Sequence, residues 1–250
     1  MEHYSSIIDV KRKHFSILDD GAKSIAIKLV KDIPVSGQIL QYIVTLYKSA
    51  NEEKIFNENE LFESAYHQPI TADLEFFIAR ILYHYSKIKK LRWHIYLRKQ
   101  KKNSSSGKLV APDIKIEKNN KVVAILEIKA KAGFMKSFFS TKIALREKLK
   151  NKNPEEYIKK NREQLLKYTQ IAGSKKKVFV FLPTFTHVSK KKDSNSITEY
   201  RKAFQVNSTL PGSNLIILSN DLFLNLETCK DNINLDPTRD FEGFIKLISK

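Results

Sequence analysis

Two acidic residues and a lysine stand on either side of a short turn in the middle of the chain. Asp113 follows Pro112 at the start of one apolar run, and Glu127-Ile128-Lys129 ends the next. Carboxylate oxygens are the ligands that Mg²⁺ prefers, and a lysine can balance negative charge that develops beside them. If the fold brings them together, these side chains could hold a divalent metal ion next to a scissile phosphate.

The stretch that contains these residues predicts a β-hairpin. Residues 110–117 and 122–129 are rich in apolar and β-branched side chains, and the polar residues between them indicate a turn. A three-residue loop over 119–121, with an asparagine in the left-handed conformation, would place Asp113 directly opposite Glu127. Directly opposite residues share a face of the hairpin, with Cβ atoms about 5 Å apart.

The same register gives the hairpin one polar and one apolar face. Lys129 lies two residues after Glu127 and therefore projects from the side of the two acids. The opposite face is uniformly apolar and carries Ile114, Ile116, Ala124, Leu126 and Ile128. A shift by one residue would divide the acids between two faces and disrupt the apolar set. The chemistry and the hydrophobic pattern therefore predict the same register.

The charge of the chain points to a polyanionic partner. The formal net charge is +18, from 45 lysines and arginines against 27 acidic residues. Such a protein is attracted to polyanions, of which nucleic acid is the commonest inside cells. Lysine, asparagine and isoleucine are all abundant, which an AT-rich genome would also produce. The charge therefore favours a nucleic acid as the partner, and the base composition of the genome is the alternative explanation.

The remaining composition excludes several classes of protein. Hydrophobic residues make up 42% of the chain, which supports a sizeable core and argues against wholesale disorder. No apolar run approaches the roughly 20 residues of a membrane-spanning helix, and the first residues lack a signal-peptide pattern. The single cysteine, Cys229, excludes an internal disulfide and a cysteine metal cluster. We expect a cytoplasmic protein without a membrane partner.

The order of the predicted elements is typical of an α/β protein. Hydrophobic periodicity predicts helices within residues 1–57, 57–91, 154–172, 197–204 and 240–249, and strands within 91–100, 177–182 and 214–218. The runs 178–182 and 214–218 are short and strongly apolar, as expected for strands in the interior of a sheet. We expect an α/β sandwich with a mixed sheet flanked by helices.

Pro112-Asp113, followed across the hairpin by Glu127-Ile128-Lys129, resembles the PD-(D/E)XK nuclease superfamily. The order of elements extends the resemblance from about Asp73 to Leu218. It implies the restriction-endonuclease-like fold, a three-layer sandwich with a mixed central sheet. Residues 58–250 would form this nuclease domain, and residues 1–57 a mostly helical N-terminal extension.

The resemblance also implies roles for individual residues. In that superfamily the aspartate and the glutamate bind Mg²⁺, and the lysine positions or activates the attacking water. Asp113 and Glu127 would thus be metal ligands, together with the backbone carbonyl of Ile128, and Lys129 would be catalytic. Mn²⁺ would be a substitute for Mg²⁺.

Many members of the superfamily carry a further glutamate on the helix before the sheet, as both a metal ligand and a catalytic residue. Glu75 is the first candidate for this role, because it lies in the predicted helix that precedes the sheet. Glu63, on the preceding helical segment, is the second candidate. The alternative for Glu75 is an ordinary exposed acid on the surface of a helix.

RecB-type members add a Gln-x-x-x-Tyr on the helix after the hairpin, and Gln164 and Tyr168 match it. A spacing of four puts both side chains on one helix face, where they could point at the site or at DNA. The alternative is an exposed helix surface with a tyrosine in the core. Lys131 and Lys136 are the other candidates for contact with nucleic acid.

The function that the resemblance implies is Mg²⁺-dependent endonucleolytic hydrolysis of DNA. Two alternatives stay open at this point: a nucleic-acid-binding module of the same fold without catalysis, and a nuclease for RNA or branched DNA. The intact Asp113, Glu127 and Lys129 argue against a silent module, which need not keep all three. Sequence-specific cleavage would usually require a homodimer, and the sequence leaves that open.

Overall fold

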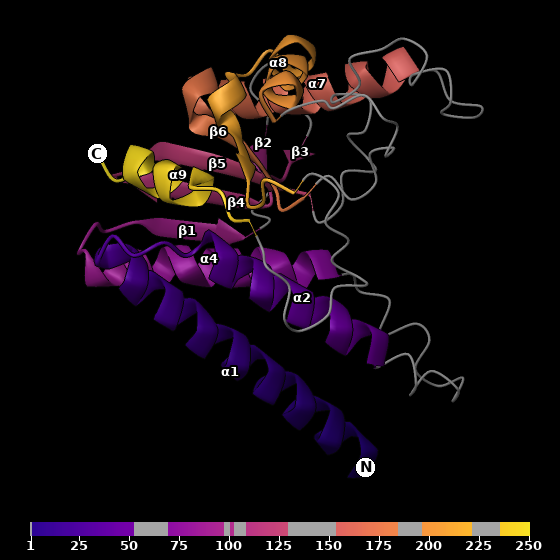
Figure 1. Cartoon of the computed structure of the whole chain (residues 1–250), viewed down its shortest axis with the longest axis vertical. Helices are drawn as coiled ribbons and strands as arrows, with labels where there is room; N and C mark the ends of the chain where they lie inside the picture. The colour runs from indigo at the N-terminus through magenta and orange to yellow at the C-terminus, as the bar shows by residue number, and fades with distance from the viewer. Residues whose placement is uncertain are drawn as a thin grey trace.

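A five-stranded mixed sheet lies at the centre of the molecule, with helices on both of its faces (Figure 1). The computed structural model describes residues 2–52, 70–97, 101–102, 109–129, 154–184, 197–221 and 236–250. The strands of the sheet, in spatial order, are β1 (His94–Leu97), β4 (Ile114–Lys118), β5 (Lys121–Ile128), β6 (Val178–Leu182) and β7 (Leu215–Ile217). A separate antiparallel pair joins β2 (Lys101–Lys102) to β3 (Leu109–Val110).

The α-helices are α1 (Glu2–Val30), α2 (Ser36–Glu52), α4 (Ile70–Ile88), α7 (Pro154–Ala172), α8 (Ile197–Ser208) and α9 (Asp240–Ile248). Two short 3-10 helices, η3 (Lys175–Lys177) and η4 (Gly212–Asn214), precede β6 and β7. The expected α/β architecture with a mixed sheet between helices is confirmed. None of the described helices is long and apolar enough to cross a membrane.

The strands of the sheet are antiparallel on one side and parallel on the other. β1, β4 and β5 pair antiparallel, whereas β5, β6 and β7 pair parallel. β6 is an interior strand as expected, but the expectation for β7 is wrong, because it ends the described sheet. Its side chains are nevertheless buried, since they enter the apolar clusters on both faces. A continuous apolar run therefore indicates a buried strand, but helices packed on both faces can bury a strand that lies at the edge of the sheet.

The hairpin of β4 and β5 has the expected register near the acids but a different turn. Ile114 pairs with Leu126 and Ile116 with Ala124, as the predicted register requires. The expected three-residue loop is wrong. Asn119 and Asn120 form a two-residue turn with φ of 52° and 59°, a conformation that asparagine tolerates and that matches the hairpin twist.

A β-bulge reconciles the shorter turn with the predicted register. The pairing shifts by one residue between Ile116 and Glu117, so Val123 is the extra residue of β5. A bulge adds one residue to one strand and leaves the pairing beyond it displaced by one. The shorter turn alone would shift the pairing by one residue, and the bulge shifts it back. Asp113 and Glu127 therefore stay on one face of the hairpin.

The two faces of the sheet build two apolar cores. The predicted apolar set of the hairpin is buried and joins side chains of α1, α2, α4 and α9 in the first core. On the other face, Ile125 and Val180 pack with Leu165 of α7 and Phe204 of α8. The N-terminal helices therefore share a core with the sheet. The expected boundary between residues 57 and 58 lies outside the described residues.

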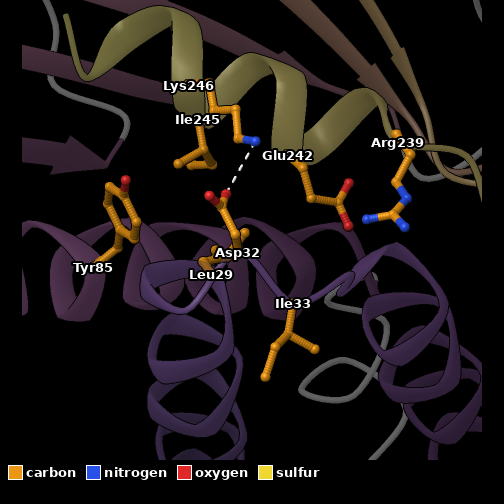
Figure 2. Close-up of a pocket in the computed structure, with 8 residues that line it drawn as sticks. All are labelled: Leu29, Asp32, Ile33, Tyr85, Arg239, Glu242, Ile245 and Lys246. Carbon is orange, nitrogen blue, oxygen red and sulfur yellow. Dashed lines mark ion pairs between the residues drawn. The ribbon is translucent and has the colours of Figure 1, made fainter.

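Helix α9 ties the N-terminal helices to the rest of the fold. The carboxylate of Glu242 accepts the N–H groups of Val35 (2.6 Å) and Ser36 (3.0 Å), and the Ser36 hydroxyl (2.8 Å). It thereby satisfies N–H groups that the start of α2 would leave without an intrahelical partner. Figure 2 shows the adjacent pocket, where Lys246 of α9 pairs with Asp32 at 3.0 Å. The candidate catalytic residues do not line this pocket.

Candidate active site

Asp113 immediately precedes β4 and reaches across to the end of β5. Its Oδ2 accepts the backbone N–H of Ile128 at 2.7 Å. The neighbouring Glu127 side chain is 3% exposed and close enough for its charge to act on Asp113. The hairpin therefore brings the two acids together at one end of the sheet.

Glu127 is bonded by three of the side chains that the sequence singles out. Lys129 Nζ lies 2.5 Å from Glu127 Oε1, and the Tyr168 hydroxyl donates to Oε2 at 2.9 Å. Gln164 Nε2 donates to Oε1 at 3.1 Å and also lies 2.7 Å from the Tyr168 oxygen. The Glu-x-Lys segment and the Gln-x-x-x-Tyr segment thus converge on one carboxylate.

Helix α7 positions Gln164 and Tyr168 through its apolar side. The helix begins at Pro154 and ends before Gly173, whose φ of 71° suits a residue without a side chain. Leu165 and the Tyr168 ring are buried against the sheet, which directs the Tyr168 hydroxyl at Glu127. Tyr168 is therefore a core residue, and its hydroxyl also contacts the site.

Glu75 comes to the same site from α4. Its side chain is 3% exposed, so it is not an ordinary surface acid. The neighbouring Leu74 and Phe77 pack into the first core and fix the rotation of the helix. The charge of Glu75 acts on Asp113, which places the third predicted carboxylate within electrostatic reach of the first.

The electrostatics of the site favour a protonated Asp113. Burial, and then the charge of Glu127, raise the pKa of Asp113 to about 7. Glu75 adds to this increase, whereas the N–H of Ile128 and the charge of Lys129 oppose it. The pKa of the Tyr168 hydroxyl is also raised, mainly by burial and then by Glu127, so it stays a hydrogen-bond donor.

The chemistry of these side chains suits a hard cation. Asp113, Glu127 and Glu75 offer carboxylate oxygens, the donors that Mg²⁺ prefers, and a divalent ion would relieve their mutual repulsion. Within the described ranges, however, no three His, Cys, Asp or Glu side chains are grouped as a ready metal site. The oxygens of Glu127 are bonded to Lys129 and Tyr168 instead. The three carboxylates supply the donor chemistry that suits Mg²⁺, and in this structure the oxygens of Glu127 are held by hydrogen bonds from neighbouring side chains.

Several predicted residues are not tested by these observations. Glu63, Lys131 and Lys136 lie outside the described residues. At Ile128 the observed contact is made by the N–H, which donates to Asp113. The expected metal contact through the carbonyl of Ile128 stays a prediction.

The structure adds polar groups that the motif did not include. Lys115, two positions after Asp113, is 4% exposed, bonds Glu117 at 2.7 Å and lies 4.5 Å from the centre of the Tyr96 ring. The alternation of Asp113, Lys115 and Glu117 could have predicted a polar strip along β4. The carbonyl of Ala111, 3.4 Å from the Tyr168 hydroxyl, has no sequence signal, because it is a backbone group.

Comparison with known proteins assigns no family to the chain. No protein-family model, no curated protein and no solved structure matches it. A functional proposal therefore depends on the chemistry of the site and on the charge of the chain.

Proposed function

We propose that this protein is a Mg²⁺-dependent endonuclease of the PD-(D/E)XK type that hydrolyses phosphodiester bonds in DNA. One observation carries the proposal: side chains from the hairpin, from α7 and from α4 converge on Asp113 and Glu127. The mixed sheet between helices is compatible with a restriction-endonuclease-like fold. The net charge of +18 favours a polyanionic substrate.

Each residue has a chemical task in this reaction. Hydrolysis joins the oxygen of a water to phosphorus, breaks the bond to the leaving oxygen and returns a proton to that oxygen. Asp113, Glu127 and Glu75 would hold the ion through carboxylate oxygens. When bound, Mg²⁺ polarises the phosphate and lowers the pKa of a coordinated water. Lys129 would stabilise the negative charge that develops on the phosphate oxygens.

Gln164 and Tyr168 would act through Glu127. Both donate hydrogen bonds within its immediate surroundings, and the Tyr168 ring is locked in the second core. Partners that bond a ligating carboxylate set its orientation, and their loss typically lowers metal affinity or activity by about 10–100-fold. We therefore assign them as positioning residues.

The electrostatic cost of burying these acids together argues against the alternative of a silent binding module. Burying Asp113 beside Glu127 and Glu75 raises its pKa to about 7, which disfavours the charged form in the folded protein. A module that only binds nucleic acid would gain stability by losing such a cluster. Strongly shifted carboxylates are common where chemistry requires them.

The test is a cleavage panel with the full chain. Plasmid, linear duplex, single-stranded and branched DNA, and RNA, are incubated with Mg²⁺, Mn²⁺ or EDTA. Asp113→Ala, Glu127→Ala and Lys129→Ala should each abolish metal-dependent cleavage. Glu163→Ala and Lys202→Ala, which remove exposed charges of the same kinds, should cleave like the wild type. Thermal unfolding verifies that each variant is folded.

The panel also separates the alternatives. Activity that all three site variants retain would refute the site assignment. Salt-sensitive binding to DNA without cleavage under either metal ion would support the silent module. Cleavage confined to RNA or to branched DNA would keep the site and change the substrate class.

A further inference from the structure

The end of the sheet opposite the candidate active site carries a row of cations, here named the basic rim. It consists of Lys90, Arg92, Lys118, Lys121, Lys175 and Lys176. Lys118 is half-buried and the other five are exposed. They belong to three connections: the α4–β1 segment, the hairpin turn and η3.

The pairing of the strands places these connections side by side. Arg92 lies two residues before His94, which pairs with Glu117, while Lys118 pairs with Lys121 across the hairpin turn. On the far side of the hairpin, Lys177 Nζ donates to the carbonyl of Val122 at 2.8 Å, which holds η3 against the start of β5. The cations therefore follow one another across the ends of β1, β4, β5 and β6.

The basic rim is separate from the candidate active site. Glu127 lies six positions after Lys121 along β5, and a strand rises by about 3.3 Å per residue, which gives about 20 Å. Its cations therefore cannot neutralise the carboxylates of the site or contact the scissile phosphate itself.

Within the part of the chain that the structure describes, no ion pair engages a cation of the basic rim. The ion pairs between described residues engage other cations, namely Arg80, His84, Lys115, Lys129, Arg201 and Lys246. Glu117, the acid beside the rim, is bonded to Lys115. Helix dipoles favour cations after α4 and α7, but they do not account for Lys118 and Lys121 in the hairpin turn.

The backbone of the rim provides a second observation. Lys90 and Arg92 have φ of 55° and 56°, in the left-handed region that glycine and asparagine occupy more readily. The hairpin turn next to them uses Asn119 and Asn120 for the same conformation. Lys90 closes α4, where the Leu91 N–H donates to the carbonyl of Ser86 at 2.9 Å, so its φ is that of a helix C-cap. The chain therefore turns sharply at Lys90 and Arg92, and both side chains are exposed.

We propose that the basic rim binds the phosphate backbone of duplex DNA, about 20 Å from the site of cleavage. This inference rests on the proposed function, because it takes the polyanion to be the nucleic acid that the site hydrolyses. Four strands at about 4.8 Å give the rim a length of about 14 Å, which equals the axial rise of about four base pairs of duplex DNA. The polar Asn119 and Asn120 between the lysines suit phosphate oxygens better than a lipid surface.

The test compares pairs of substitutions that change the net charge equally. Lys118→Ser/Lys121→Ser and Lys175→Ser/Lys176→Ser are the rim pairs, and Lys23→Ser/Lys202→Ser is the control pair, whose lysines are equally exposed on α1 and α8. Fluorescence anisotropy in EDTA, at several salt concentrations, measures binding of the full chain to a labelled duplex of about 40 base pairs, long enough to span rim and site.

Each rim pair should weaken binding about tenfold and lower the slope of log affinity against log salt by up to about 1.8, because two phosphate contacts are lost. The control pair should change affinity less than about twofold. If the control pair weakens binding as much as the rim pairs, the proposal is overturned. It is also overturned if the rim pairs bind DNA like the wild type but no longer sediment with anionic lipid vesicles.

A cleavage arm keeps this inference distinct from the proposed function. A duplex of about 6 base pairs is about 20 Å long and cannot occupy rim and site fully at once. With Mg²⁺, rim pairs should slow cleavage of the long duplex about tenfold and leave cleavage of the short one unchanged. Equal loss on both duplexes would overturn the rim as a distant contact. Absence of wild-type cleavage with intact rim-dependent binding would refute the nuclease alone.

Discussion

Two clusters in this protein are built around an aspartate, and the pKa of the two aspartates shifts in opposite directions. Asp19 of α1 lies between Arg80 and His84 of α4, and its pKa is lowered to about 2. Asp113 lies beside Glu127 and Glu75, and its pKa is raised to about 7. The first aspartate lies near solvent and is bonded to Arg80 and His84, whereas the second is half-buried beside other acids.

The Asp19 cluster has the geometry of an ion pair that stabilises the packing of two helices. Arg80 Nε and Nη2 donate to the two oxygens of Asp19 at 2.5 and 3.0 Å, and His84 Nε2 lies 2.7 Å from Oδ1. The hydrogen bond from Arg80 is the main cause of the lowered pKa. The ionised form is therefore favoured in the folded state, and the contact stabilises the packing of α1 on α4.

The Asp113 cluster has the opposite character. Burial and neighbouring acids make the ionised form costly there, and the bonds from Ile128 and Lys129 only partly offset that cost. A contact that exists for stability would not be built in this way. The contrast shows that the sign of a pKa shift, together with its cause, separates an ion pair that stabilises helix packing from a cluster of acids that costs stability.

The largest expected difference between the clusters is in activity. Glu127→Gln should reduce metal-dependent cleavage by about 10³-fold or more, because it replaces a carboxylate that would hold the metal ion in the proposed reaction. Asp19→Asn should change the rate less than about twofold. Initial rates of plasmid cleavage at saturating Mg²⁺ give the comparison. Equal losses in the two variants would remove the distinction between the clusters.

A smaller loss of activity is expected when the support of Glu127 is removed. Tyr168→Phe keeps the buried ring and deletes the hydroxyl that donates to Glu127 Oε2. Cleavage should fall by about 10–100-fold, with a matching loss of Mg²⁺ affinity. The concentration of Mg²⁺ at half-maximal rate is the readout that a merely structural role would not change. An unchanged value would contradict the positioning role.

In metal-free buffer, replacement of Asp113 by a neutral residue should stabilise the folded protein rather than destabilise it. Its pKa is higher in the folded protein than the ordinary value of 3.8, so the folded state loses stability as pH rises from about 4 to about 7. Asp113→Asn should therefore raise the free energy of unfolding by about 1–3 kcal/mol above pH 7 and by little near pH 4. Urea unfolding in EDTA measures both values. Destabilisation at neutral pH would contradict the prediction.

The smallest expected effect belongs to Asp19. Its folded-state pKa is below the ordinary value of 3.8, so its contribution to stability is present above pH 3.8 and disappears as pH falls towards 2. Because the group is about one-third exposed, Asp19→Asn should cost only about 1 kcal/mol at pH 6. Chemical unfolding of both proteins at pH 6 and pH 2.5 should show the difference shrink. A constant difference would assign the effect to packing.

Hydrophobic periodicity predicted many of the helices and strands of this protein, because it depends only on residues that are near one another in the sequence. The alternation around Asp113 and Glu127 determined which side chains share a face, and hydrophobic periodicity predicted the helix over 154–172. The turn was misjudged, because both a two-residue and a three-residue turn suit the asparagines there. Only pairing along the whole hairpin, including the bulge at Val123, distinguished them.

Tertiary packing decided what converges on the acids. Glu75 approaches Asp113 because Leu74 and Phe77 rotate α4 onto the first core, and Tyr168 reaches Glu127 because α7 packs on the second. Such contacts join segments tens of residues apart, whose relative placement depends on how the cores fill rather than on any local pattern. The sequence by itself determined the acids, the lysine and their shared face. The packed structure decided their burial, the raised pKa of Asp113 and the separate row of cations at the far end of the sheet.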